Sequence, residues 1–256
     1  MTTTTPAVRA SESNHWYTRD GVPMYTVEAK KGGKRPTTLR DARVMDLVPS
    51  VTTVLNIAAK PALLAWMQQQ VLLAALTLPR RPDELEKEYI DRIIKDSKEQ
   101  GRSAADAGTD IHAAVQGHYE GETPTKHLES VQGCSEAIQG VFGKQEWISE
   151  RSFCHESGYG GKSDLYTPDG AGIVLDIKTK EFSSVGDVKG YDEHLMQLAA
   201  YRVGLGVPHA RCANVFVSRN SLGLSVVKEW SNEELNDGWA MFCHLLSFWQ
   251  IKNSHK

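Results

Sequence analysis

The 256-residue sequence has few cysteines, no excess of positive charge and no long apolar run. Its four cysteines stand singly, without the close spacing of zinc or iron–sulfur sites or the pattern of a secreted disulfide framework. No apolar stretch approaches the roughly 20 residues that span a bilayer, and MTTTTPAVRASES at the N-terminus has no apolar core for a secretory signal. We therefore expect a cytoplasmic protein without a membrane partner, and the sequence disfavours a mitochondrial location.

The charge is unevenly placed, although the formal net charge is only −3. One segment near the N-terminus contains a single acid, Asp41, among six cations: Lys30, Lys31, Lys34, Arg35, Arg40 and Arg43. Such a segment is either an ordinary solvated charge run or a patch that contacts phosphate groups. Composition alone does not decide between these two interpretations.

The first half of the chain is predicted to be mainly helical. Residues 1–13, rich in Thr and Ser, predict a disordered tail, and Asp20-Gly21 predicts a turn between two short strands. Helices are then expected after Ser50, as an N-cap, and from Pro61. Further helical patterns cover 84–100, 103–121 and 127–145.

The second half changes to strands flanked by two helices. Strand patterns fall at 146–156, 160–168, 172–179, 212–219 and 224–230, and helical patterns at 191–206 and 232–252. Neither a repeat nor a low-complexity linker separates the halves. We predict a single α/β domain over 14–256, with a mainly helical part at 14–145 and the sheet-containing core at 146–256.

A hairpin in this core brings acidic residues together. Thr167-Pro168-Asp169-Gly170 is a turn sequence, and a turn centred near Gly170 places Asp164 opposite Asp176, with Lys178 on the same face. Two opposed carboxylates repel unless a cation lies between them, and a divalent ion with oxygen ligands meets that need. A metal and a lysine are suited to phosphodiester hydrolysis. The alternative is a surface hairpin with a simple Asp–Lys ion pair.

Four motifs around this hairpin resemble a known nuclease family. They are Gly108-Thr109-x-x-His112, Gly161-x-x-Asp164, Asp176-Ile177-Lys178-Thr179 and Gln197-x-x-x-Tyr201. In this order of helix, strand, strand and helix they resemble the RecB-like branch of the PD-(D/E)XK nucleases. PSVTTVL at 49–55, followed by Lys60-Pro61 and Trp66, is similar to the mitochondrial genome maintenance exonucleases and their phage-encoded relatives.

The resemblance implies a three-layer PD-(D/E)XK core with a mixed sheet, behind the N-terminal helical extension. In that fold the first three strands form a meander, and a right-handed crossover through the helix at 191–204 leads to the fourth strand. The implied metal, Mg²⁺ or Mn²⁺, has as ligands His112, Asp164, Asp176 and the Ile177 carbonyl. The implied catalytic residues are Asp164, Asp176, Lys178, Gln197 and Tyr201.

Other residues are candidates for substrate contacts. Hydroxyls at a helix N-terminus and the basic segment are able to hold phosphate groups, and the candidates are Ser50, Thr52, Lys30, Lys31 and Arg35. Glu150 is a candidate outer acid of the site. Simpler roles stay open: Ser50 and Thr52 as helix caps, and His112 as a core histidine beside which Gly108 leaves space.

The resulting interpretation is a metal-dependent DNA exonuclease. It would hydrolyse phosphodiester bonds from single-stranded ends in replication, recombination or repair, in a bacterial or phage-infected cell. The N-terminal helices are expected to lean over the site and admit one strand, with Trp16, Tyr17 and Trp66 as possible stacking surfaces. The alternatives are a flap endonuclease with the same site, a catalytically silent DNA-binding member of the fold, and a small-molecule phosphoesterase.

The cysteine pattern leads to a prediction about iron. Several RecB-like nucleases hold an iron–sulfur cluster with one cysteine before the domain and three after it, whereas the C-terminal region here has only Cys243. We expect the purified protein to be colourless and to contain no iron by elemental analysis. DNA cleavage should stop in EDTA and return with Mg²⁺ or Mn²⁺. Visible absorbance that tracks with iron, or cleavage that survives chelation, would contradict this prediction.

Overall fold

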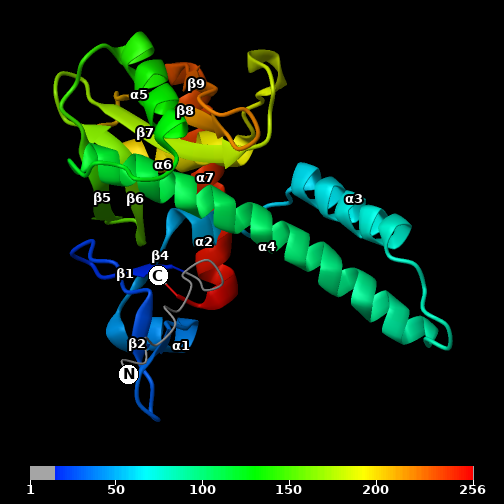
Figure 1. The fold of residues 1–256 in the computed structure, drawn as a ribbon. Helices are drawn as coiled ribbons and strands as arrows, with labels where there is room; N and C mark the ends of the chain where they lie inside the picture. The colour runs from blue at the N-terminus through cyan, green and yellow to red at the C-terminus, as the bar shows by residue number, and fades with distance from the viewer. Residues whose placement is uncertain (1–14, 256) are drawn as a thin grey trace.

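The computed structural model describes residues 15–255, so the tail predicted over 1–13 lies outside the described residues. Figure 1 shows a sheet-containing body from which two helices project. In chain order the elements are β1 (Trp16–Tyr17), β2 (Thr26–Glu28), β3 (Lys34–Pro36), α1 (Leu39–Met45), β4 (Val48–Pro49), α2 (Val51–Leu55), α3 (Pro61–Thr77), α4 (Glu86–Tyr119), α5 (Leu128–Phe142), β5 (Ile148–His155), β6 (Tyr159–Thr167), β7 (Ile173–Lys180), η2 (Val185–Asp187), α6 (Asp192–Gly204), β8 (Arg211–Ser218), β9 (Ser225–Trp230) and α7 (Asn232–Asn253).

A five-stranded mixed sheet has the order β5-β6-β7-β8-β9. Strands β5, β6 and β7 form the expected antiparallel meander, α6 connects β7 to the parallel strand β8, and β9 pairs antiparallel with β8. Leu165 pairs with Leu175. This register puts Asp164 and Asp176 at the next opposing positions, as the turn sequence predicts. The expectation of an α/β fold with a mixed sheet is confirmed.

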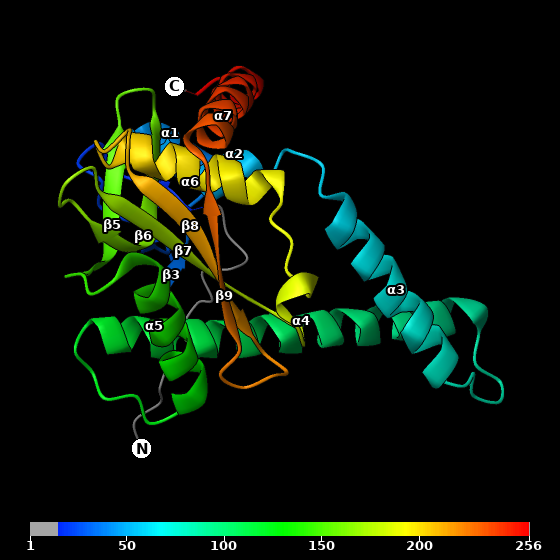
Figure 2. The same cartoon turned by 90° about the horizontal axis from the view of Figure 1, so that it is seen from above.

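Helices cover both faces of the sheet. Figure 2 shows α6 and α7 on one side and α5 with the C-terminal part of α4 on the other. One core joins Tyr166 and Val174 to α2, α6 and α7, and a second core joins Leu175 and Ile177 to α4 and α5. Neither face of the hairpin is left to water, because each is packed against a helical layer.

Helix α4 is longer than the sequence suggests. The patterns at 84–100 and 103–121 predict two helices, but the structure has one helix of 34 residues, Glu86–Tyr119. Gly101 lies inside it, where glycine costs about 1 kcal/mol relative to alanine. The ring of Trp66 on α3 lies over this glycine, 3.5 Å from where a Cβ would stand. The helix is therefore unbroken at Gly101, and α3 packs against it at the position where the sequence predicts a break.

The N-terminal hairpin predicted around Asp20-Gly21 is formed in part. Gly21 turns the chain with φ of +80°, and Tyr17 forms an antiparallel bridge with Pro23 across the turn. In addition β1 pairs with β4, and β2 pairs with β3, which the sequence did not predict. Trp16 and Tyr17 are 0% and 2% exposed, so they belong to the core and offer no stacking surface. Trp16 packs edge-on against Trp249 of α7 at a ring distance of 5.9 Å. The two residues of β1 that pair with β4 are thus also the two whose aromatic rings are buried in the core.

The N-terminal helices do not all cover the sheet. Helix α2 packs on α6, and the C-terminal part of α4 packs on β7. By contrast, α3 and the N-terminal half of α4 extend away from the body (Figures 1 and 2). Within the described residues, no helix is both long enough and apolar enough to cross a membrane.

Candidate active site

The site begins where β6 and β7 separate. Their pairing stops at Leu165 and Leu175, one position before the two acidic residues. The Asp164 carboxylate occupies the gap, and its Oδ2 accepts a hydrogen bond of 2.6 Å from the backbone N–H of Ile177. A side chain thus replaces the carbonyl that would otherwise satisfy this donor. The arrangement fixes Asp164 against β7 without closing the gap between the strands.

Asp176 is the most enclosed charged group of the site, with an exposure of 2%. Lys178 donates to it from 2.9 Å, and the side-chain amide of Asn214 donates from 2.8 Å. The amide oxygen of Asn214 in turn accepts from the indole N–H of Trp230 at 2.8 Å. Both oxygens of Asp176 therefore have partners, as a buried carboxylate requires.

The two carboxyl groups have opposite shifts in pKa. Burial raises the pKa of Asp176, and the neighbouring charge of Asp164 adds to the increase, although Lys178 opposes both. Burial also acts to raise the pKa of Asp164, but the charge and hydrogen bond of His112 outweigh it and lower that pKa. Two interacting acids are thus held in one low-dielectric site, and added positive charge would stabilise both.

His112 approaches from the other face of the sheet. It lies on α4 with its Nε2 3.1 Å from Oδ2 of Asp164. Burial lowers the pKa of His112, but the charges of Asp164 and Asp176 raise it overall. Asp164 is therefore the polar partner of the His112 imidazole.

Gly108 brings α4 close to β7. A Cβ on Gly108 would stand 2.4 Å from Oγ1 of Thr179, so a larger residue requires Thr179 to change its rotamer or α4 to move away from β7. The space that the sequence suggested beside the His112 imidazole instead accommodates Thr179, which follows Lys178. The Gly-x-x-x-His spacing therefore sets the distance of the helix from the strand that carries the catalytic candidates.

Lys178 is held by a chain of hydrogen bonds from α6. Its Nζ donates to Oε1 of Gln197 at 3.0 Å, and Nε2 of Gln197 donates to the Tyr201 hydroxyl at 2.9 Å. Gln197 and Tyr201 are buried, so they face Lys178 rather than solvent. Gly161 makes room for this chain, because a Cβ there would stand 2.9 Å from the Tyr201 ring.

The polar groups of the site form a donor set for a divalent cation. In the described part of the chain, no three His, Cys, Asp or Glu side chains converge in metal-binding geometry. Oδ1 of Asp164 nevertheless has no hydrogen-bond partner among those residues. The negative charge of Asp164 also destabilises the ionised form of Asp176. Two coupled carboxylates are ligands suited to Mg²⁺ or Mn²⁺, so the chemistry of the residues fits such an ion.

The proposed substrate-contact residues make other contacts in the fold, although Ser50 lies beside β6, where it forms a bridge with Gly160. Ser50 is buried and caps α2 by accepting from the Thr53 N–H at 3.0 Å, and Thr52 bonds to Ser50 at 2.9 Å. Lys30 and Lys31 are exposed near the turn of the β2–β3 hairpin, at the end of the molecule opposite the sheet in Figure 1.

Arg35 of the same hairpin is engaged by an acid. Its guanidinium forms an ion pair of 2.6 Å with Asp41. The six cations of the basic segment are therefore not all available to phosphate. The structure brings His112, Asp164, Asp176, Lys178, Gln197 and Tyr201 together, whereas the hydroxyls of α2 and the basic hairpin serve other contacts.

Several site residues were not identified from the sequence. Asn214 orients Asp176, and Trp230 orients Asn214; one polar residue inside the apolar strand CANVFVS was the available signal.

On β5, Glu150 lies across from Asp164 in the strand register, adopts a φ of +55° and forms an ion pair with Lys162. Glu150, suggested as an outer acid, thus neutralises a lysine beside the site.

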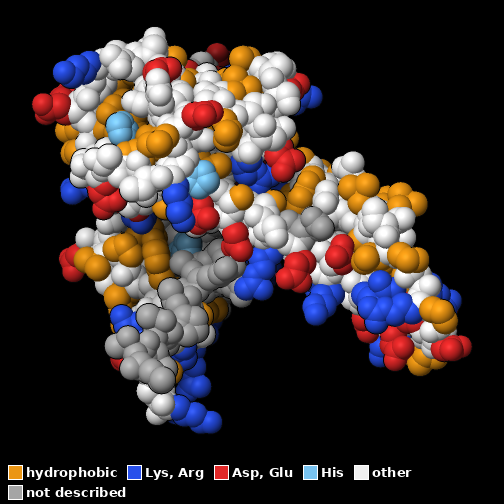
Figure 3. Space-filling model, in the orientation of Figure 1, with side chains coloured by type: hydrophobic (Ala, Val, Ile, Leu, Met, Phe, Trp, Pro, Cys, Tyr) orange, Lys and Arg blue, Asp and Glu red, His pale blue; other side chains and the backbone are white. Residues whose placement is uncertain are grey.

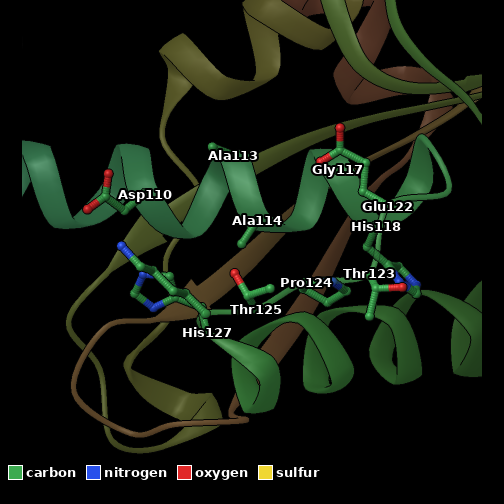
Figure 4. A pocket seen from close by; sticks show the side chains of 11 residues that line it. Asp110, Ala113, Ala114, Gly117, His118, Glu122, Thr123, Pro124, Thr125 and His127 are labelled. Atoms are coloured by element: carbon green, nitrogen blue, oxygen red, sulfur yellow. The ribbon is translucent and has the colours of Figure 1, made fainter.

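A separate pocket of about 300 Å³ lies between α4 and the connection to α5. Figure 4 shows Asp110 and His127 at one end of it and His118 at the other. None of the residues assigned to metal binding or catalysis lines this pocket. It is therefore distinct from the Asp164–Asp176 site.

Comparison with known proteins gives little guidance. No protein-family model and no curated protein matches the chain. Among solved structures, SSO0001 is 14% identical over 72% of this chain and 86% of its own, with a TM-score of 0.30. The alkaline exonuclease LHK-Exo from Laribacter hongkongensis is 11% identical over 80% of this chain and 92% of its own, with a TM-score of 0.37. Such distant similarity carries no argument about activity.

The close approach at Gly108 can be tested with two alanine substitutions in one helix. We expect Gly108→Ala to push α4 and His112 away from β7 and to lower any metal-dependent activity by about 100-fold, since a displacement of about 1 Å has that effect on a reaction site. Gly101→Ala, whose Cβ would meet only ordinary contacts, is the control and should leave activity unchanged. Melting curves verify that both variants are folded. Equal activity of the two variants would show that α4 does not position the site.

Proposed function

We propose that the protein is a metal-dependent nuclease of the PD-(D/E)XK type. The observation that carries the proposal is the enclosed cluster of Asp164, Asp176 and Lys178 at the point where β6 and β7 part. An ordinary surface ion pair would be solvated, whereas Asp176 is buried and its pKa is raised by burial and by a second carboxylate. A fold gains no stability from two acids placed in this way, so a function in binding cations accounts for them better.

The proposed ligands are Asp164, Asp176, the Ile177 carbonyl and His112. A bound Mg²⁺ or Mn²⁺ would polarise a phosphoryl oxygen and lower the pKa of a water molecule. Lys178 would orient that water and stabilise negative charge on the phosphate, since its pKa stays above the usual value despite burial because of Asp176 and Asp164. Gln197 and Tyr201 would hold the Lys178 ammonium in place.

We further propose that the substrate is single-stranded DNA entering beside the N-terminus of α6. Burial lowers the pKa of His194 there to about 3, and the positive charges of Lys178, Lys180 and Lys60 add to the decrease. A pocket of about 400 Å³ lies beside this helix end, and its lining includes Lys60 and Tyr191 but also the acidic residues Asp192 and Glu193. Clustered lysines suit a phosphate backbone and an exposed aromatic ring suits a base. These lysines support the proposal more directly than the basic segment at 30–43.

The first test separates chemistry from binding. Asp176→Asn and Lys178→Ala should each lower cleavage of end-labelled single-stranded DNA by at least about 100-fold, because they remove groups that act on the reacting phosphate. Binding, measured by fluorescence anisotropy, should fall far less than cleavage, because Lys60, Lys180 and other backbone contacts remain in both variants. Asp169→Asn removes a carboxylate from the exposed turn of the same hairpin and should cleave normally. Near-normal cleavage by either site variant would refute the assignment, and loss of cleavage in the control would make the effect non-specific.

The second test asks whether a free end is required. Linear and circular single-stranded DNA of one sequence are incubated under the same metal and salt conditions, and released nucleotides are quantified. We expect the linear strand to be degraded and the circle to persist. Equal degradation would favour the endonuclease alternative, and binding that falls steeply with salt but yields no products would favour the silent DNA-binding member.

A further inference from the structure

The projecting helices form an arm whose surface is unusual for a protein exposed to water. We use "the arm" for residues 61–102, which are α3, the connection to α4 and the first half of α4. Figures 1 and 2 show that the arm extends away from the sheet and its covering helices. Its helix α3 packs against α4, so one side of α3 is covered and the others are open.

Helix α3 has no charged residue in its 17 positions, PALLAWMQQQVLLAALT. Ala74 is its one buried residue. Eight large apolar side chains are between 37% and 83% exposed, namely Leu63, Leu64, Trp66, Met67, Val71, Leu72, Leu73 and Leu76. A helix that is apolar on all sides is normally buried on all sides.

The exposed apolar side chains lie in two places. Some line an open groove of about 460 Å³ between α3 and α4, where Trp66, Met67 and Val71 meet Ile94 of α4. Others continue around the helix, and Figure 3 shows apolar side chains along the arm. With about 3.6 residues per turn, Leu72 and Leu76 lie on the side of α3 opposite the buried Ala74. Apolar side chains therefore occur both in the groove and on the outer face, and the uncharged residues Gln68, Gln69 and Gln70 lie among them.

We propose that the arm is a dimerisation element and that its partner is the arm of a second copy of this chain. The first reason is charge. The first half of α4, residues 86–102, carries five acidic and five basic residues, EKEYIDRIIKDSKEQGR, and α3 carries none. A nucleic acid or an anionic membrane would attract an excess of cations, which the arm lacks. A neutral surface with both signs interspersed is complementary to its own copy in a two-fold arrangement.

The second reason is the amount of surface. The eight apolar side chains expose on the order of 700 Å², close to the roughly 800 Å² that each partner buries in a standard interface. Helix α3 is about 25 Å long, so two arms side by side and antiparallel would form a four-helix bundle. Most of the arm points away from the sheet (Figure 1), and its base, including Leu63, lines the pocket beside the N-terminus of α6. A dimer through the outer face of α3 therefore does not need to cover the Asp164–Asp176 sites. The inference is independent of the proposed nuclease activity.

The experiment measures the mass of the full chain by sedimentation, from about 1 µM to about 100 µM. Leu72→Lys combined with Leu76→Lys places two charges on the outer face of α3. Both side chains are mainly exposed within one chain, at 65% and 83%, so the variant should fold, and circular dichroism verifies this. The matched control combines Val44→Lys with Leu222→Lys, which adds the same charge at positions 82% and 63% exposed outside the arm.

We expect the wild type and the control to be dimers and the arm variant to be a monomer, with a dissociation constant raised at least about 100-fold. The wild-type dimer should persist in about 1 M NaCl, because its contacts are apolar rather than ionic. A wild-type chain that stays monomeric at the highest concentration would overturn the proposal. An arm variant that still dimerises, or a control that dissociates equally, would overturn it as well.

Discussion

The separation of β6 and β7 is the constraint on which the candidate site depends. Had the pairing continued beyond Leu165 and Leu175, the Ile177 N–H would have bonded to a backbone carbonyl, and the two aspartates would have met across a closed ladder. Instead the Asp164 carboxylate takes this N–H at 2.6 Å. The side chain both satisfies the strand and creates the gap, so one interaction produces the opening and fixes a carboxylate within it.

The polar side chains around this gap stabilise the negative charge of its two carboxylates. Lys178 and Asn214 bond to Asp176, and His112 pairs with Asp164. Burying an acid without such partners would cost several kcal/mol. The compensating groups come from α4, β7 and β8, with α6 holding Lys178 through Gln197. The layers on both faces of the sheet are therefore needed for the site as well as for the core.

The N-terminal part of the chain divides into two kinds of helical structure. Helix α2 and the C-terminal half of α4 pack on the body, and Gly108 lets α4 lie close enough to present His112. The arm contributes little to this packing, and its apolar residues remain on the surface. Since burial of apolar area stabilises a fold by about 25 cal/mol per Å², the exposed area on α3 is better explained by association than by folding of one chain.

The sequence by itself determined the local features: the hairpin register, the N-cap at Ser50, the start of α3 at Pro61 and the positions of the site motifs. These follow from turn chemistry and side-chain periodicity, which act over a few residues. Tertiary structure decided that α4 continues through Gly101, that Trp16 and Tyr17 are buried, and that Asn214 and Trp230 support Asp176. It also decided that Gly108 faces Thr179 and that α3 stays uncovered. Each of these depends on contacts between segments far apart in the chain, whose geometry no local pattern specifies.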